Sequence, residues 1–349
     1  MLSNSRFKKE KPILGVAGFG GGATSLFRGG ASPKPIEATG GTVSEADGRK
    51  FHLFSYPNSD NFVISDLGDD PTVNINYICC GGGGGGGFEG GGGGGAGAFR
   101  TGTYPSGVGT HRVSLGAPGL GGGGPTAPTK YPGNPTDRPG EDGGSTTLVY
   151  NSNTIFSSGG GGGGKSYPEG DPASPSSKGN PSPNTGLSVP PSTPGNGSGG
   201  GGSWGPWGHN LGGGAAGPTW VGLGVYGYPG TRGSTGEDKA GGGGGFSGNC
   251  SPTSSSSFAC QPGGSGATTP WIPTSFGDGG YFSGGGAGGG ASTPASGGPG
   301  GGGDSCNSPW SDNAATANSG GGGGGASNGG DTSGGGPGSA GVVIISYPV

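Results

Sequence analysis

The stretch that decides the fold is residues 73–99, VNINYICCGGGGGGGFEGGGGGGAGAF. Apolar side chains occupy every second position from Val73 to Cys79, which is typical of a β-strand with one buried face. Two glycine blocks, 81–87 and 90–95, follow with no turn signal between strand and glycine. Glycine loses more conformational freedom on folding than any other residue. The glycine is therefore either a flexible tether or an ordered element in its own right.

Composition argues against an ordinary hydrophobic core. Of the 349 residues, 102 are glycine and only 26% are hydrophobic, too little apolar material for a conventional core in a chain of this length. Such a composition usually indicates low complexity or disorder. Here, however, the net charge is only -4, and the apolar residues are clustered into strand-like islands. These two features favour an ordered chain.

Further glycine blocks recur along the chain, separated by segments rich in Pro, Ser, Thr, Asn and aromatic residues. The longer ones are at 121–124, 159–164, 199–202, 241–245, 300–303 and 320–325. The absence of a strict three-residue glycine repeat excludes collagen. A glycine run can adopt the left-handed helix of polyproline II, whose backbone N–H and C=O groups all point outward. Packed side by side, several such helices could bond to one another, so we predict a polyglycine II bundle, with a flexible linker as the alternative.

The two ends of the chain carry the clearest strand patterns. Alternating residues on both sides of a turn predict a hairpin from Phe51 to Ser65. Residues 341–349, GVVIISYPV, are apolar on both faces, as in a covered central strand. We expect the hairpin, the strand at Val73 and this final strand to form one small sheet. Two islands, 111–119 and 145–160, look like strands that feed further glycine.

The predicted fold class is therefore mainly β and irregular, with essentially no α-helix. A small antiparallel sheet closes a bundle of polyglycine II helices with long connecting loops. We divide the chain into an arm at 1–40, a hairpin and strand at 41–80 completed by 341–349, and a bundle with exposed loops at 81–340. The arm has the charge layout of a signal peptide, but glycine dilutes its apolar part, so we expect it to be retained.

The motifs of catalysis and cofactor binding are missing from the sequence. His52, His111 and His209 have no Cys or carboxylate at metal-site spacing, so they are predicted to be packed or surface residues. GGGGKS at 161–166 does not follow the spacing of a phosphate loop. The mild acidity disfavours a nucleic-acid partner, and the longest apolar run is too short for a membrane span. We expect a protein that is not an enzyme and binds no cofactor or metal.

The five cysteines indicate little about the fold or the function of the protein. Cys79 and Cys80 are adjacent, so on a strand they face opposite sides and are not expected to pair with each other. Cys250 and Cys260 bracket a serine-rich loop that a disulfide could close, and Cys306 is left over. We favour free thiols, with the disulfide left open.

Large aromatic residues fall mainly in the segments between glycine blocks. Tyrosine and tryptophan dominate binding hot spots, and antibody loops use a similar mixture of Tyr, Ser, Gly and Asn. The alternative is that these rings pack over the ends of the bundle. SWGPWGHN at 203–210 is the best single candidate for an exposed contact. The receptor-binding candidates are Tyr104, Tyr131, Tyr167, Trp204, Trp207, His209, Trp220, Tyr226, Tyr228, Trp271 and Trp310.

Five stretches together resemble a known family. They are GGTVSEADGRKFHLFSYPNSDNFVIS (40–65), VNINYICCGGGGGGG (73–87), THRVSLGAPG (110–119), GGSTTLVYNSNTIFSSGGGGGG (143–164) and GGGPGSAGVVIISYPV (334–349). Their order and content resemble the glycine-rich domain of bacteriophage tail and fibre proteins, which is abundant in marine cyanophages. The resemblance covers about residues 40–349. Its departures are the loops, which do not align with a characterised adhesin, and Cys79 and Cys80, which replace small apolar residues.

The resemblance implies a phage virion protein made in the host cytoplasm. The start of the chain is similar to the starts of many cyanophage structural proteins, which implies a virion-docking arm with Arg6, Phe7, Lys8, Lys9 and Lys11 as contacts to other tail proteins. The architecture is similar to tail-fibre-tip adhesins, which implies host attachment through loops that bind a surface polysaccharide or outer-membrane protein. A homotrimer is left open. The alternatives are a purely architectural virion part, an ice-binding protein and a cell-wall matrix protein.

Overall fold

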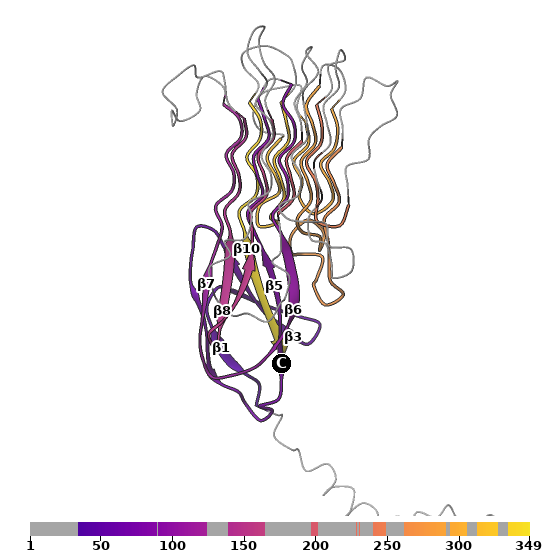
Figure 1. The fold of residues 1–349 in the computed structure, drawn as a ribbon. Coiled ribbons are helices and arrows are strands. Elements are labelled where there is room, and N and C mark those ends of the chain that lie inside the picture. Colours follow the sequence, from indigo (N-terminus) through magenta and orange to yellow (C-terminus); the bar gives the residue numbers. More distant parts are fainter. Residues whose placement is uncertain are drawn as a thin grey trace, which may run out of the picture.

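The computed structural model describes residues 34–88, 90–123, 139–164, 197–201, 228, 230, 240–248, 262–290, 294–305, 313–326 and 334–349. In this part of the chain, ten β-strands form two five-stranded antiparallel sheets, and no helix is present (Figure 1). The protein is therefore mainly β, as its sequence predicted.

The strands of the two sheets come from both ends of the chain. The first sheet has the order β1 (Glu37–Thr39), β4 (Asn61–Asp66), β7 (Gly109–Ser114), β8 (Thr146–Tyr150) and β9 (Asn153–Ser157). The second has the order β2 (Thr42–Ala46), β3 (Arg49–Ser55), β10 (Val342–Pro348), β5 (Asn74–Cys80) and β6 (Phe99–Pro105). β10 lies at the centre of the second sheet, paired with β3 and β5 as predicted.

The two sheets pack face to face as a sandwich. Phe54 and Ile345 of the second sheet share one buried cluster with Phe62 and Leu148 of the first. On its other face, the second sheet is covered by the segment 267–282, which buries its own apolar side chains against that sheet. This double covering explains why β10 is apolar on both faces.

Two expectations about the start of the chain are wrong. β3 and β4 do not form a hairpin, because they belong to different sheets and the connection between them crosses the sandwich. An alternating pattern shows that a strand has one buried face but not which strand it pairs with, so the sequence could not separate these arrangements. The arm was also expected to extend to residue 40, but the sandwich begins before that residue, because β1 already pairs with β4.

The expected bundle at 81–340 contains four strands of the sandwich. β7, β8 and β9 confirm the two predicted islands, whereas β6 was not predicted. Gly102 interrupts the pattern of β6 and lies opposite Tyr77 of β5. A Cβ atom on Gly102 would lie 2.9 Å from the Tyr77 hydroxyl oxygen. Glycine therefore leaves room for the ring to lie across the neighbouring strand.

Six strands continue directly into glycine-rich segments, each of which we call a rod. Figure 1 shows the rods side by side, extending away from the sandwich. β5, β7 and β9 lead into rods 81–87, 115–123 and 158–164, and rods 91–98, 139–145 and 334–341 lead into β6, β8 and β10. The glycine that follows the strand at Val73 is therefore a continuation of the fold.

Rod 81–87 donates its backbone hydrogen bonds with a period of three residues. The N–H groups of residues 81, 84 and 87 donate to rod 91–98, those of 82 and 85 to rod 139–145, and those of 83 and 86 to rod 334–341. The C=O groups follow the same rule. Those of 82 and 85 accept from rod 158–164, and those of 83 and 86 from rod 115–123. Those of 84 and 87 accept from the glycine-rich segment 320–326, which joins no strand and which we also call a rod. One rod thus has six hydrogen-bonded neighbours.

No side chain fits at the central positions of rod 81–87. A Cβ atom on Gly83, Gly84 or Gly85 would overlap the carbonyl oxygen of a different neighbouring rod in each case. The rod is buried along its length, and its N–H groups all have partners, so it avoids the penalty of unpaired buried backbone. Glycine is needed here for close approach.

Small residues mark the junction between sandwich and rods. Ser157 Oγ of β9 donates to the Cys79 carbonyl oxygen of β5 at 2.8 Å, which links the two sheets. Gly116 N–H donates to Thr146 Oγ1 at 3.0 Å, which links rod 115–123 to β8. Cys79 lies in the cluster between the sheets and Cys80 in the cluster on the opposite face, as predicted. Both are free and buried. Cys250, Cys260 and Cys306 lie outside the described residues.

Burial keeps both of these thiols protonated. It raises the pKa of Cys79 to about 11 and raises the pKa of Cys80 well above its usual value. A thiolate is the reactive form of cysteine, so neither residue is a nucleophile at neutral pH.

Candidate functional site

The rods define two ends of the molecule. The proximal ends join the sandwich, and at the distal end the rods are bonded to one another around the turn between rods 81–87 and 91–98. There Gly92 N–H donates to the Gly164 oxygen at 2.8 Å, Gly289 N–H to the Gly91 oxygen at 2.9 Å, and Ala326 N–H to the Gly87 oxygen at 3.0 Å. This hydrogen-bonded distal end is the candidate functional site.

Several excursions of the chain start from the distal end. The described residues on both sides of 124–138 and of 327–333 lie there, since Gly122 bonds to rod 81–87 at Gly86 and Gly335 bonds in turn to Gly122. Residues 164 and 201, which precede the excursions 165–196 and 202–227, are also joined there by a hydrogen bond from Gly164 N–H to the Gly201 oxygen. One end of the bundle therefore anchors segments that are far apart in the sequence.

Most of the candidate residues lie outside the described part of the chain. The receptor-binding candidates in this group are Tyr131, Tyr167, Trp204, Trp207, His209, Trp220, Tyr226 and Trp310. The docking candidates in this group are Arg6, Phe7, Lys8, Lys9 and Lys11. The predictions made for all of them stay predictions.

Tyr104 was expected in an exposed loop, and this is wrong. It lies on β6, and only 1% of its surface is exposed. Its hydroxyl is 3.0 Å from His111 Nδ1, and its ring stacks on Tyr150 with centroids 4.2 Å apart. Burial raises the pKa of Tyr104 above its ordinary range. A side chain enclosed in the sandwich core is not available to a receptor.

Trp271 and Tyr228 are the other two described candidates, and both contact the body of the protein. Trp271 is half-buried and stacks on Phe51 of the second sheet, with centroids 6.5 Å apart. The backbone of Tyr228 joins two glycine segments, since its N–H donates to the Gly245 oxygen at 3.2 Å and its oxygen accepts from Gly199 N–H at 3.1 Å. For Trp271 the structure supports packing of the ring on the protein, and for Tyr228 it shows backbone contacts.

The two described histidines are also packed in the core. His52 Nδ1 lies 2.7 Å from the Gly40 carbonyl oxygen, which can only accept, so Nδ1 carries the proton. Its Nε2, 3.0 Å away from the Tyr347 hydroxyl, then accepts from it. Burial lowers the pKa of His52 and of His111, so both are neutral at pH 7. Among the described residues, no three potential ligands are grouped to hold a metal ion.

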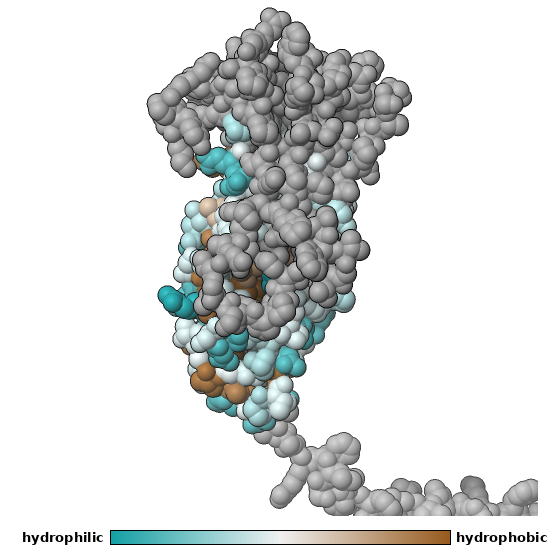
Figure 2. Space-filling view, in the orientation of Figure 1, coloured by the Kyte–Doolittle hydropathy of each residue, from teal (hydrophilic) through white to brown (hydrophobic). Residues whose placement is uncertain are grey.

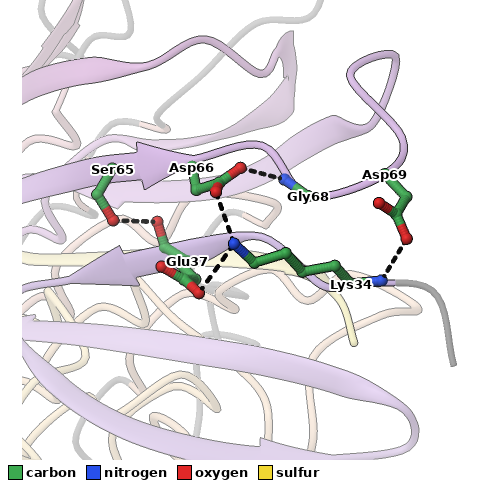
Figure 3. A network of polar contacts seen from close by, with 6 residues as sticks. All are labelled: Lys34, Glu37, Ser65, Asp66, Gly68 and Asp69. Atoms are coloured by element: carbon green, nitrogen blue, oxygen red, sulfur yellow. Dashed lines mark hydrogen bonds and ion pairs between the residues drawn. The ribbon is translucent and has the colours of Figure 1, made fainter. Parts of the chain in front are cut away.

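The opposite end of the molecule receives the N-terminal segment. Lys34 lies there beside Asp66, the last residue of β4. This end of β4 lies away from the rods, because Ile64 pairs with Gly109 at the start of β7, and β7 runs from there toward rod 115–123. Figure 3 shows Lys34 Nζ held by Asp66 Oδ2 at 2.7 Å and by Glu37 Oε1 at 3.3 Å. The hydrogen bond with Asp66 is the main reason that the pKa of Lys34 is raised and that of Asp66 lowered. These exposed ion pairs fix a position more than they add stability.

On the face seen in Figure 2, the described surface of the sandwich is mainly pale or hydrophilic, with small hydrophobic areas. Single exposed apolar residues are normal on a soluble surface. The large hydrophobic residues exposed in the described part are Val43, Tyr56, Val108, Leu120, Tyr281 and Val349.

Sequence reasoning missed a group of carboxylates that bind backbone N–H groups of the bundle. Asp142 Oδ1 accepts from Gly162 at 2.8 Å, and Asp304 Oδ1 accepts from Gly297 at 2.7 Å. Asp278 Oδ2 likewise accepts from residues 300 and 301, at 3.0 and 3.1 Å. A lone aspartate next to a glycine block is the signal that could have found the first two.

Comparison of the sequence with known proteins finds no match. No protein-family model matches the sequence, and no curated protein matches it. Within the described residues there is no helix long and apolar enough to cross a membrane.

Proposed function

We propose that this chain is a virion protein of a tailed bacteriophage, a part of a tail fibre or similar appendage that attaches the particle to its host. Its distal segments would bind a host-surface polysaccharide or outer-membrane protein, and residues 1–33 would dock to other tail proteins. The family resemblance of the sequence suggests this role. The observation that carries it is the placement of the two ends, since separate excursions start at the distal end while Lys34 lies at the opposite end.

We further infer that the rods are polyglycine II helices. A helix with three residues per turn and outward-pointing backbone groups would change its hydrogen-bonding partner with a period of three. The donors and acceptors of rod 81–87 follow this period and reach six neighbours. A bundle of this kind would act as a rigid pedestal, because the position of each rod is fixed by bonds in several directions.

The composition of the distal excursions supports a binding role. They contain six of the tyrosine and tryptophan residues predicted as contacts, mixed with Ser, Gly and Asn. The six are Tyr131, Tyr167, Trp204, Trp207, Trp220 and Tyr226. Such mixtures supply large rigid contact areas together with adaptable hydrogen bonds. A rigid support favours affinity, because less conformational entropy is lost when a preorganised loop binds.

Adsorption of phage to host cells tests the proposal. The purified protein should compete with the phage for adsorption, and Trp204→Ala with Trp207→Ala should weaken this competition at least tenfold, as expected for loss of a binding hot spot. Tyr56→Ala is the matched control, because Tyr56 is an exposed aromatic residue of the sandwich, and it should compete like the unchanged protein. Undiminished competition by the double variant would contradict the assignment of these loops.

An architectural role in the virion is the second candidate, because Trp271, one of the residues predicted to bind a receptor, stacks on Phe51 of the protein itself. Immunogold labelling of intact particles separates the two roles. Attachment predicts label at the outer tip of a fibre. Label confined to the capsid or tail tube, with no competition for adsorption, would favour the architectural role.

A further inference from the structure

Part of the bundle is built from glycine-rich segments that adjoin no described strand of the sandwich. A rod such as 81–87 takes its register from the strand that it continues. The segments without a strand need another source of register, either the rods around them or side chains. We call these segments the strandless rods, and they are 197–201, 240–245, 263–266, 283–289, 296–298, 301–305 and 320–326.

Three of the strandless rods are the most remote from the strands in the hydrogen-bond network. Among the described residues, the backbone partners of rods 263–266, 296–298 and 301–305 all lie in segments that adjoin no strand. For example, Gly298 N–H donates to the Gly285 oxygen at 2.8 Å. We call these three the outer strandless rods. Strand pairing therefore does not set their positions directly.

The loop 267–282, which we call the anchor loop, lies between two strandless rods. It leaves rod 263–266 and enters rod 283–289. Its ends are tied together, because Ala267 and Phe282 exchange two backbone hydrogen bonds of 2.8 Å. Figure 1 shows orange loops from this part of the chain beside the sandwich, next to β6.

Side chains fix the anchor loop to the second sheet. The Phe276 ring lies 5.3 Å from that of Phe51 on β3, and the Phe282 ring stacks on Phe99 of β6 with centroids 6.1 Å apart. Ile272 is buried in the same cluster. Because β10 and β5 lie between β3 and β6 in the sheet, the loop is held across much of the width of the sheet.

Asp278 of the anchor loop extends this link to the other two outer strandless rods. Its Oδ2 accepts from the N–H groups of Gly300 and Gly301 at 3.0 and 3.1 Å. These glycines form the turn between rods 296–298 and 301–305, and their φ values of 104° and 83° favour glycine. A Cβ atom on Gly300 would lie 2.7 Å from a carbonyl oxygen of the anchor loop. The turn is therefore held against the loop by two hydrogen bonds to one carboxylate.

We propose that the anchor loop sets the position of the three outer strandless rods, with Asp278 as the positioning residue for the turn at 300–301. The second sheet then reaches these rods through side chains, whereas it reaches rod 81–87 through a continuous strand. Rod 283–289 continues the path to the distal end, where Gly289 N–H donates to the Gly91 oxygen. This role is separate from host attachment and does not depend on it.

Amide hydrogen exchange with residue-level resolution tests the proposal in the full chain. In Asp278→Ala, the amides of residues 298, 302 and 303 should exchange faster by about tenfold or more, as expected when a unit loses two hydrogen bonds to a charged acceptor. Residues 300 and 301 are left out of the comparison, because they lose their own acceptor. The amides of rod 81–87 should keep their rates.

The matched control is Asp142→Ala. It also removes a carboxylate that accepts from a glycine N–H group, that of Gly162. The two rods involved, 139–145 and 158–164, adjoin β8 and β9. Apart from Gly162 itself, their amides should therefore change by less than about twofold.

A second pair of variants tests the contact with the sheet. Phe276→Ala removes the ring that packs on Phe51 and leaves Asp278 in place, so it should accelerate the same amides as Asp278→Ala. Tyr281→Ala is its control, because Tyr281 is an exposed aromatic residue of the same loop. This control should exchange like the unchanged protein.

Three results would overturn the proposal. One is a folded Asp278→Ala variant in which residues 298, 302 and 303 exchange at their original rates. Another is an equal acceleration in rod 81–87, which would show general loosening. The third is an equal acceleration of the control rods in Asp142→Ala, which would show that any lost carboxylate has this effect.

A milder pair of variants covers the case in which circular dichroism shows that Asp278→Ala does not fold. Asp278→Asn keeps one acceptor oxygen, so it should accelerate the same amides by less than full removal of the side chain. It is compared with Asp142→Asn, which should leave its rods unchanged. Equal exchange in these two variants would contradict a positioning role for Asp278.

Discussion

The sandwich and the glycine bundle are built from the same chain segments but are held together in opposite ways. In the sandwich, side chains such as Phe54 and Ile345 fill the space between two sheets, which usually pack about 10 Å apart. In the bundle, the absence of side chains lets each backbone bond to neighbours in several directions. At the point where β5 continues into rod 81–87, the main stabilising interaction therefore changes from side-chain burial to main-chain hydrogen bonding.

The comparison also shows what each region gives to the other. A glycine rod has no side chains to set its register, so it could slip past its neighbours. The strands of the sandwich prevent this, because the pairing of Cys80 with Phe99 continues as a 3.0 Å hydrogen bond from Gly81 N–H to the Ala98 oxygen. Side-chain packing specifies the register, and the rods extend it to the distal end.

The largest expected effect comes from adding one side chain to the bundle. In Gly83→Ala, the new Cβ atom would overlap the backbone of Gly321 in a rod that is bonded on several sides. We expect a loss of about 4 kcal/mol or more in the free energy of unfolding, above the usual range for overpacking. Denaturant unfolding followed by circular dichroism measures it. Gly107→Ala is the control, because its Cβ atom would be 3.6 Å from its nearest neighbour atom, and a stability loss as small as in this control would contradict close packing of the rods.

Removing a buried side chain should lower the free energy of unfolding strongly in the sandwich and only slightly in the bundle. Ile344 of β10 is fully buried in the cluster beneath the segment 267–282. We expect Ile344→Ala to lower the free energy of unfolding by about 3 kcal/mol, and Ile344→Val by about 1 kcal/mol, as is usual for buried methylene groups. The contrast is Ala96→Gly in rod 91–98, which should change stability by less than about 1 kcal/mol. Equal losses for Ile344→Ala and Ala96→Gly would remove the distinction between the two regions.

A smaller effect concerns pH and should be confined to the sandwich. Burial lowers the pKa of His52 and His111 in the folded protein. In the unfolded chain a histidine has a pKa of about 6.5. Below that pH the unfolded state binds more protons, so the stability present above pH 6.5 is lost as the pH falls through the folded pKa values. The urea concentration at the midpoint of unfolding, measured from pH 7.5 down to pH 5, should fall as the pH falls. His52→Gln combined with His111→Gln should flatten this dependence, and an unchanged slope would show that the histidines are not its source.

The sequence predicted those elements whose pattern is local. The apolar run at Val342 indicated a covered central strand, and the low net charge with clustered apolar residues favoured an ordered chain over a flexible tether. The partners of β3 and β4 were not predictable, because their alternating patterns fit a hairpin and a sandwich equally well. β6 was missed because Gly102 breaks its pattern, and the error on Tyr104 followed from that.

Which N–H groups of a rod find partners in neighbouring rods was not predictable either, for a different reason. Which N–H group points outward depends on how many neighbours a rod has, and this is decided by the arrangement of all rods together.

Amide hydrogen exchange tests the central claim most directly, because it reports on the backbone of each region in one experiment. If main-chain bonds between rods provide the rigidity of the bundle, the amides of residues 81–87 should exchange as slowly as those of β5 and β10. Exchange of these glycines at the rate of an unstructured peptide, while β5 and β10 stay protected, would contradict the account.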